Sequence, residues 1–284
     1  MGGLHPAAKL GLLYLYPVER AALLDLLGQL KPDEWAAPTE CPAWSVKGIA
    51  LHLLADDLSL LSRQRDDEPP GVSIEAGASF DELFVALDRF NERWVEAASF
   101  SSPPVVMELL RLSGEWTHAF YGAVDGDRLG EPVPWIGPDP APYWLLTARE
   151  YWERWIHQEQ IRRAVGRPGL HDARFVVPSL AVAMRGFPQG LAPFPAPEGT
   201  AVTLRITDAD AAAWTVGSDG QTWTLYDGAP DHPTVAISLD LETAALLFSR
   251  ALTNADLTER LRPEGDADLG AVMLGGLAAF FARR

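Results

Sequence analysis

The chain has 284 residues, of which 39 are acidic and 23 are Lys or Arg, giving a formal net charge of −16. This balance argues against nucleic-acid binding as the main function, because contacts to a phosphate backbone need clustered Lys and Arg. The single cysteine excludes an intramolecular disulfide and any metal site built from thiolates alone. The 48% hydrophobic fraction and the ten Trp exclude a disordered chain, and the length indicates two domains.

Targeting and membrane signals are the next features to consider. Residues 1–15 lack a cationic leader and a small-residue cleavage site. Charged residues or prolines interrupt the apolar stretches well before the roughly 18 residues that a membrane span needs. We therefore expect a cytoplasmic protein with no membrane partner. We also expect the protein to be a monomer or a homodimer.

Residues 1–172 show the spacing of apolar side chains that is typical of amphipathic helices. Ser45 is a candidate N-cap for one of them. Four or five such helices without a strand pattern indicate an up-down helical bundle, and the Pro-rich segment 125–142 is a long connection within it. The predicted helices cover residues 18–30, 46–65, 80–98, 105–124 and 143–165.

Residues 173–284 have a different pattern, in which apolar and polar residues alternate as in half-buried strands. Residues 217–220 form a predicted hairpin turn. The pair Gly275 and Gly276 lies in an apolar helix and suggests close packing there. This part of the chain is therefore expected to be a small α+β domain. Its predicted strands are 201–207, 213–216, 223–226 and 234–239, and its predicted helices are 241–249 and 269–281.

Two histidines and a glutamate form the strongest candidate site. Glu153 and His157 are four residues apart, which places both side chains on one face of a helix. Together with His52 they make a set of three protein ligands with an open position, the catalytic pattern for zinc and similar ions. Two plainer interpretations remain open: His52 can be a hydrogen-bonded core residue, and the Glu153–His157 pair an ordinary contact on a helix surface. Asp56, one turn after His52, could orient its imidazole.

Other site types have less support in the sequence. It contains no phosphate-binding glycine motif and no nucleophile elbow. Cys41 has no companion residue of a nucleophilic site, and we interpret it as structural or incidental. Trp44 flanks the candidate ligands and could line a pocket above a metal ion, although most aromatic clusters at helical spacing are simply core.

Two segments resemble a known family. Residues 41–53 (CPAWSVKGIALHL) are similar to the pattern C-x-x-W-[ST]-V-x-x-[VIL]-x-x-H-[LI] of the mycothiol-dependent maleylpyruvate isomerase family, which has a DinB-type metal-binding bundle. Residues 153–166 (ERWIHQEQIRRAVG) are similar to that family's E-x-x-x-H-x-x-D-I-R-x-A-x-G segment. Residues 214–216, Arg250 and 265–270 resemble, more weakly, its sterol-carrier-like C-terminal domain.

The resemblance implies a DinB-like up-down four-helix bundle over residues 1–172, followed by a small sterol-carrier-like α+β domain over residues 173–284. It implies Zn²⁺ or another divalent metal on His52, Glu153 and His157, with mycothiol or a similar thiol as cofactor. Trp44 and Arg250 would bind the cofactor, and Arg250 would also act in catalysis. The implied activity is a thiol-dependent isomerase or S-transferase acting on a small electrophile such as maleylpyruvate.

Three positions depart from the family pattern without removing a ligand. Gln160 replaces a common Asp, Gly48 replaces a polar residue that is often Asp, and Ser249 stands where a Gly often precedes the Arg. Two other functions stay open: a small-ligand-binding protein with a structural metal, and a metal-dependent hydrolase using the same site.

Overall fold

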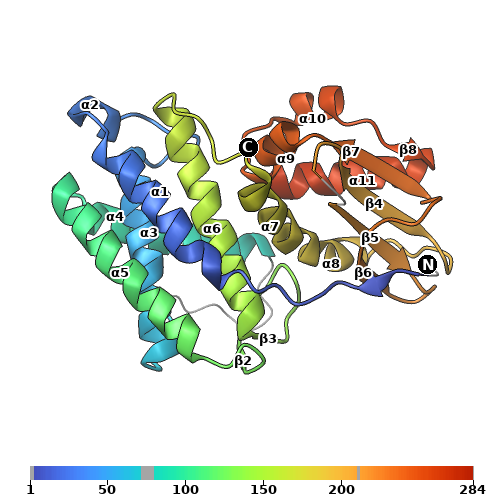
Figure 1. The fold of residues 1–284 in the computed structure, drawn as a ribbon, viewed down its shortest axis with the longest axis horizontal. Coiled ribbons are helices and arrows are strands. Elements are labelled where there is room, and N and C mark those ends of the chain that lie inside the picture. The colour runs from blue at the N-terminus through green and yellow to red at the C-terminus, as the bar shows by residue number, and fades with distance from the viewer. Residues whose placement is uncertain (1–2, 72–79, 210–211, 284) are drawn as a thin grey trace. The chain divides into compact units, whose positions relative to one another are not determined.

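The computed structural model describes residues 3–71, 80–209 and 212–283 (Figure 1). The chain forms two compact units. The chain passes between them four times, the last time at Leu170. The helical unit contains Leu12–Gly130 and His157–Gly169, and the sheet unit contains Met1–Gly11, Glu131–Ile156 and Leu170–Arg284.

The helices predicted in the N-terminal part are all present. Each helix begins and ends within a few residues of the predicted bounds. The last turn of the predicted helix 46–65 is a π-helical segment. The short α2 was not predicted. The elements are η1 (Leu13–Leu15), α1 (Tyr16–Gly28), α2 (Pro32–Trp35), α3 (Val46–Leu60), η2 (Leu61–Arg65), α4 (Phe80–Ala98), α5 (Pro103–Ala123) and α6 (Tyr143–Ala164).

The core of the helical unit is built around α3. This helix is apolar on nearly every side, as expected for a helix surrounded by others, and it packs against α4 and α5 (Figure 1). Burying each of its large apolar side chains stabilises the fold by roughly 1.5–3 kcal/mol before the entropy cost is counted. Fully buried members of this core include Leu23, Ile49, Leu53, Leu110 and Ile161.

The predicted connection 125–142 is more ordered than expected. Its strands β2 (Leu129–Pro132) and β3 (Pro140–Pro142) pair into a small two-stranded sheet. The high proline content hid this pairing, because proline favours extended backbone at sheet edges as well as loops.

The sheet unit contains a six-stranded sheet with the order β1-β6-β5-β4-β7-β8. All four predicted strands are present, and β5 and β6 form an antiparallel hairpin on either side of the predicted turn. Strand β4 pairs with β7 in parallel. The two edge strands were not predicted, because two-residue pairings leave no local pattern. The strands are β1 (His5–Pro6), β4 (Ala201–Ile206), β5 (Ala213–Ser218), β6 (Trp223–Asp227), β7 (Val235–Leu239) and β8 (Glu264–Gly265).

Helices of the sheet unit confirm two predictions and correct one. The predicted α9 (Leu241–Phe248) and α11 (Ala267–Phe281) are present. The prediction of close packing at Gly275 and Gly276 is wrong, because a Cβ atom added to either glycine would meet nothing within 4 Å. The helical N-terminal region and α+β C-terminal region confirm the predicted fold class. Unpredicted helices are α7 (Ala173–Ala183), η3 (Met184–Gly186), α8 (Phe187–Leu191) and α10 (Asn254–Arg260).

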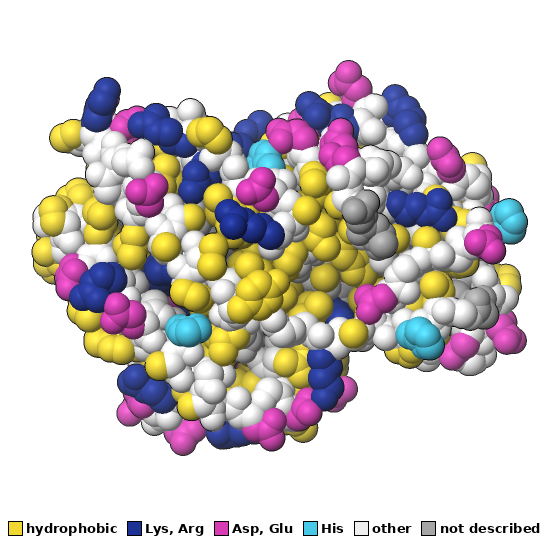
Figure 2. All heavy atoms as spheres, in the orientation of Figure 1, with side chains coloured by type: hydrophobic (Ala, Val, Ile, Leu, Met, Phe, Trp, Pro, Cys, Tyr) yellow, Lys and Arg dark blue, Asp and Glu magenta, His cyan; other side chains and the backbone are white. Residues whose placement is uncertain are grey.

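Surface charge follows the composition. On the face that Figure 2 shows, Lys and Arg side chains are scattered among Asp and Glu and do not gather into one patch. Within the described residues, no helix is long and apolar enough to cross a membrane.

Candidate metal centre

The first predicted ligand, His52, is positioned by α3. Ser45 caps this helix as predicted, since its Oγ accepts a hydrogen bond of 3.2 Å from the N–H of Gly48. His52 lies two turns further on, and only 3% of it is exposed. Because its neighbours on α3 are apolar and buried, polar interactions with the imidazole are stronger there than in water.

The other two predicted ligands lie one turn apart on α6. Glu153 is counted with the sheet unit and His157 with the helical unit, but the helix is continuous through both residues. His52, Glu153 and His157 each offer one ligand atom, and these three atoms all lie within 4.8 Å of one another. The rings of His52 and His157 meet edge to face with their centroids 4.6 Å apart. The structure thus brings the three predicted residues together.

His157 is oriented by a glutamine three residues further along α6. The Nδ1 of His157 lies 2.8 Å from Oε1 of Gln160, and the thiol of Cys41 donates to the same oxygen at 3.3 Å. An amide oxygen only accepts hydrogen bonds, so Nδ1 carries the proton and Nε2 keeps its lone pair. Histidines that bind metals are commonly fixed in this way. Gln160, a departure from the family pattern, therefore sets the tautomer of a candidate ligand.

We expect replacement of Gln160 to change metal affinity. Gln160→Leu removes the acceptor for Nδ1 and should weaken binding of Zn²⁺ about 10- to 100-fold. Gln160→Glu supplies a charged acceptor, makes the imidazole more basic, and should tighten binding. Competition titration with a chromophoric chelator measures both, with the exposed Gln29→Ala as control. A wild-type affinity for Zn²⁺ in the Gln160→Leu variant would contradict the role assigned to Gln160.

His52 is held between an acid and an indole. Oδ2 of Asp56, the residue that could orient this imidazole, lies 3.5 Å from Nε2 of His52. On its other side the ring of Trp44 stacks at a centroid distance of 4.6 Å and an interplanar angle of 26°. The Nε1 of Trp44 is buried and has no hydrogen-bond partner among the described residues.

Gly48 makes room for that stacked indole. A Cβ atom at position 48 would lie 2.9 Å from Cβ of Trp44, so any larger residue must push the tryptophan away. Glycine in place of the family's polar residue therefore allows Trp44 to pack directly against α3.

We expect Gly48→Ala to destabilise the protein by about 1–2 kcal/mol. The clash with Trp44 outweighs the roughly 1 kcal/mol that alanine gains over glycine in a helix. Urea unfolding measures the change. The matched control is Gly122→Ala in α5, where the new Cβ would lie 3.7 Å from Leu13, an ordinary contact, and stability should rise. Equal effects of the two substitutions would show that Gly48 has no steric role.

The remaining predicted site residue, Arg250, belongs to the sheet unit. It is the second residue after α9, following the C-cap Ser249, and it is exposed. The sequence analysis noted Gln160 as a departure from the family pattern but did not identify it as the partner of His157. Its position three residues after His157 places both on one helix face and could have indicated the contact. Cys41, interpreted as structural or incidental, is half-buried and contacts this partner.

Comparison with known proteins identifies the family. Residues 16–162, just over half of the chain, match the model of the mycothiol maleylpyruvate isomerase N-terminal domain. This chain belongs to that family. Two uncharacterized proteins of Mycobacterium tuberculosis, from strains CDC 1551 / Oshkosh and ATCC 25618 / H37Rv, are each 27% identical over 153 residues, covering 53% of this chain. The match spans 56% of the length of these curated relatives.

Solved structures show the same fold over most of the chain. The crystal structure of the mycothiol-dependent maleylpyruvate isomerase superposes with a TM-score of 0.55 at 13% identity, covering 90% of this chain and 92% of that one. A His-to-Ala mutant of that isomerase gives a TM-score of 0.54 at 12% identity, with the same coverage. These superpositions establish the fold, and the family model confirms the predicted family.

Proposed function

We propose that His52, Glu153 and His157 bind one divalent metal ion, with zinc as the first candidate. The observation that carries the proposal is that three such ligand atoms lie within 4.8 Å of one another. Zinc bonds to nitrogen and carboxylate oxygen are about 2.0–2.2 Å long, so small side-chain rotations would let the three atoms share one ion. Two imidazoles and one carboxylate fit the donor set of catalytic zinc sites, which keep a position open.

We further propose that the chain is an enzyme, a thiol-dependent isomerase or S-transferase, with mycothiol or a similar thiol as cofactor. A metal ion bound at this site would favour the thiolate form of that thiol. The family description and the fold shared with a mycothiol-dependent isomerase support this choice. Cys41 donates to Gln160 at the edge of the site, so the reactive sulfur is assigned to the small thiol instead.

A thiol bound at this site would supply a nucleophilic sulfur for addition to the carbon–carbon double bond of a small electrophile such as maleylpyruvate. The product would be an isomer if the thiol leaves again and a thioether if it is retained. The protein residues hold the geometry: Gln160 fixes the ring of His157, and Asp56 and Trp44 fix the ring of His52. Orientation of reacting groups of this kind lowers the barrier without new chemistry from the protein.

Trp44 is proposed to border the thiol cofactor. Its ring covers one face of His52, and its buried N–H lacks an acceptor in the described structure. A cofactor with a carbonyl or hydroxyl oxygen near this N–H would satisfy it. A buried unpaired donor costs about 1–3 kcal/mol, so the gain from such a contact is appreciable.

Arg250 is proposed to contact the cofactor or substrate, and its backbone supports this role. Its φ angle of 61° lies in the left-handed region that favours glycine. Its N–H donates to the carbonyl oxygen of Leu247, and that of Ala251 donates to Leu246, which is the arrangement of a Schellman motif. An arginine at a position suited to glycine points to a use for the side chain.

We expect Arg250→Gly to raise stability by about 0.5–1 kcal/mol, because it relieves the left-handed backbone, and to lower kcat/KM. Thermal unfolding and turnover of the same preparation measure the two changes. Arg250→Lys keeps the charge and should restore part of the activity but not gain stability. Full activity in the glycine variant would remove Arg250 from the site.

The proposed function is tested by metal analysis combined with a thiol assay. Purified protein should contain about one divalent ion per chain, and a variant with Ala at all three ligand positions should contain none. The exposed His232→Ala variant is the control. Mycothiol binding by calorimetry should disappear on chelation, and maleylpyruvate with mycothiol should give isomer or thioether. Metal loss that lowers Tm without affecting thiol binding would indicate a structural ion, and turnover of esters without thiol would indicate a hydrolase.

A further inference from the structure

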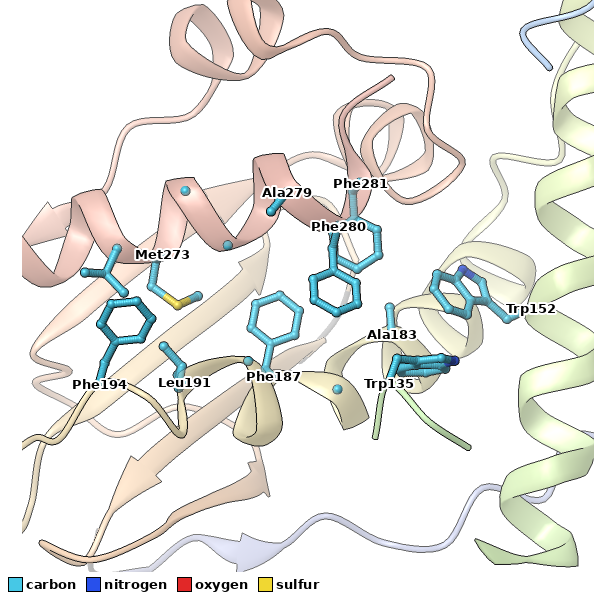
Figure 3. A pocket seen from close by; sticks show the side chains of 15 residues that line it. Trp135, Trp152, Ala183, Phe187, Leu191, Phe194, Met273, Ala279, Phe280 and Phe281 are labelled. Atoms are coloured by element: carbon cyan, nitrogen blue, oxygen red, sulfur yellow. The ribbon is translucent and has the colours of Figure 1, made fainter. Parts of the chain in front are cut away.

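A second cavity lies entirely within the sheet unit, between α11 and the segment formed by η3 and α8. Its volume is about 390 Å³, within the range of pockets that bind small molecules. Figure 3 shows Phe194 and Met273 towards one end and Trp135 and Trp152 towards the other, with Phe187 and Phe280 between them. All of these residues belong to the same unit, so the cavity is defined without reference to the rest of the molecule.

Two glycines of α11 border this cavity. Gly275 and Gly276 line it, and a Cβ atom at either position would meet nothing within 4 Å. The cavity therefore has free space directly beside the backbone of α11, enough to accept a methyl group at either position.

The chemistry of the lining is uniform. None of the side chains that line the cavity is charged; they are aliphatic or aromatic, apart from the thioether of Met273 and the indole nitrogens of Trp135 and Trp152. Trp152 is 6% exposed, and its Nε1 is buried with no hydrogen-bond partner among the described residues. Such a lining disfavours a charged ligand, which would lose its hydration without gaining a counter-ion.

We propose that this cavity binds an uncharged, mainly hydrocarbon molecule. The hydrocarbon part contacts Phe187, Met273 and Phe280. None of the three candidate metal ligands lines this cavity, and the proposed binding needs no metal ion or thiol. The outcome of a binding test at this cavity therefore does not bear on the proposed enzymatic function.

Displacement of a neutral fluorescent reporter tests the proposal. N-phenyl-1-naphthylamine is bound to the full-length protein and displaced with 2-decanone or with decanoate, which has the same chain length but a negative charge. We expect 2-decanone to compete at a concentration at least tenfold lower than decanoate, with and without EDTA. Equal or stronger competition by decanoate, or loss of binding on chelation, would overturn the proposal.

Two variants locate the ligand. Gly276→Phe fills the cavity and should weaken reporter and ketone at least tenfold, whereas Gly276→Ala leaves room and should bind both within twofold of wild type. Far-UV circular dichroism checks the fold of each variant. Unchanged binding in Gly276→Phe would place the ligand elsewhere and overturn the assignment.

Discussion

The His157→Ala variant is expected to bind Zn²⁺ about 100- to 1,000-fold more weakly than the wild-type protein. Zinc sites with four protein ligands contribute about 10–16 kcal/mol, so one ligand accounts for roughly 3 kcal/mol. His157 is 8% exposed and its Nδ1 is held by Gln160, so alanine leaves a buried gap that no neighbouring ligand fills without movement. Equilibrium titration against a chelator of known affinity measures the loss directly.

Thermal unfolding gives a second measure of the same change. An ion present at 100 times its Kd stabilises the folded state by about 2.7 kcal/mol, so added Zn²⁺ should raise the Tm of the wild-type protein and leave that of the variant nearly unchanged. His52→Ala should behave alike, because it removes another of the three ligands. An equal rise of Tm in the wild-type protein and in both variants would show that the ion binds elsewhere.

The candidate site could be predicted because its signals are local. Glu153 and His157 are four residues apart on one helix, and the Ser45 cap fixes where α3 begins and hence where His52 lies along it. The contact between Gln160 and Cys41 joins residues 119 apart in the chain, and no pattern within either segment specifies it. What the sequence could not supply was the packing of one helix against another.

The helices and strands that the sequence did not predict also depend on tertiary contacts. Helix α7 contains Pro178, which normally interrupts a helix, but Phe175 and Leu180 are 1% and 0% exposed and anchor it in the core. Strand β1 exists because His5 pairs with Asp227, more than 200 residues away. Tertiary contacts outweigh local propensity in both cases. The spacing of Gly275 and Gly276 likewise does not distinguish a tightly packed helix from one that borders a cavity.

A buried ion pair beside the site was also invisible in the sequence. Asp57 follows Asp56 directly, yet it is 0% exposed and accepts hydrogen bonds from Nη2 of Arg20 at 2.8 Å and from Oγ of Ser113 at 2.6 Å. Arg20 also donates to the carbonyl oxygen of Leu110 at 2.6 Å. These contacts join α1, α3 and α5, and they fix the helix that carries His52.

Asp57→Ala is therefore expected to destabilise the protein by about 3–5 kcal/mol, because it leaves the charge of Arg20 buried without its partner. Urea unfolding measures the loss. Replacing both charges, as in Arg20→Met with Asp57→Leu, should cost less than the single substitution, since no unpaired charge remains. The exposed pair of Arg111 and Glu108 is the matched control, and Glu108→Ala should cost at most about 1 kcal/mol. A double variant less stable than Asp57→Ala would mean that the pair itself, and not the avoidance of a buried charge, stabilises the helical unit.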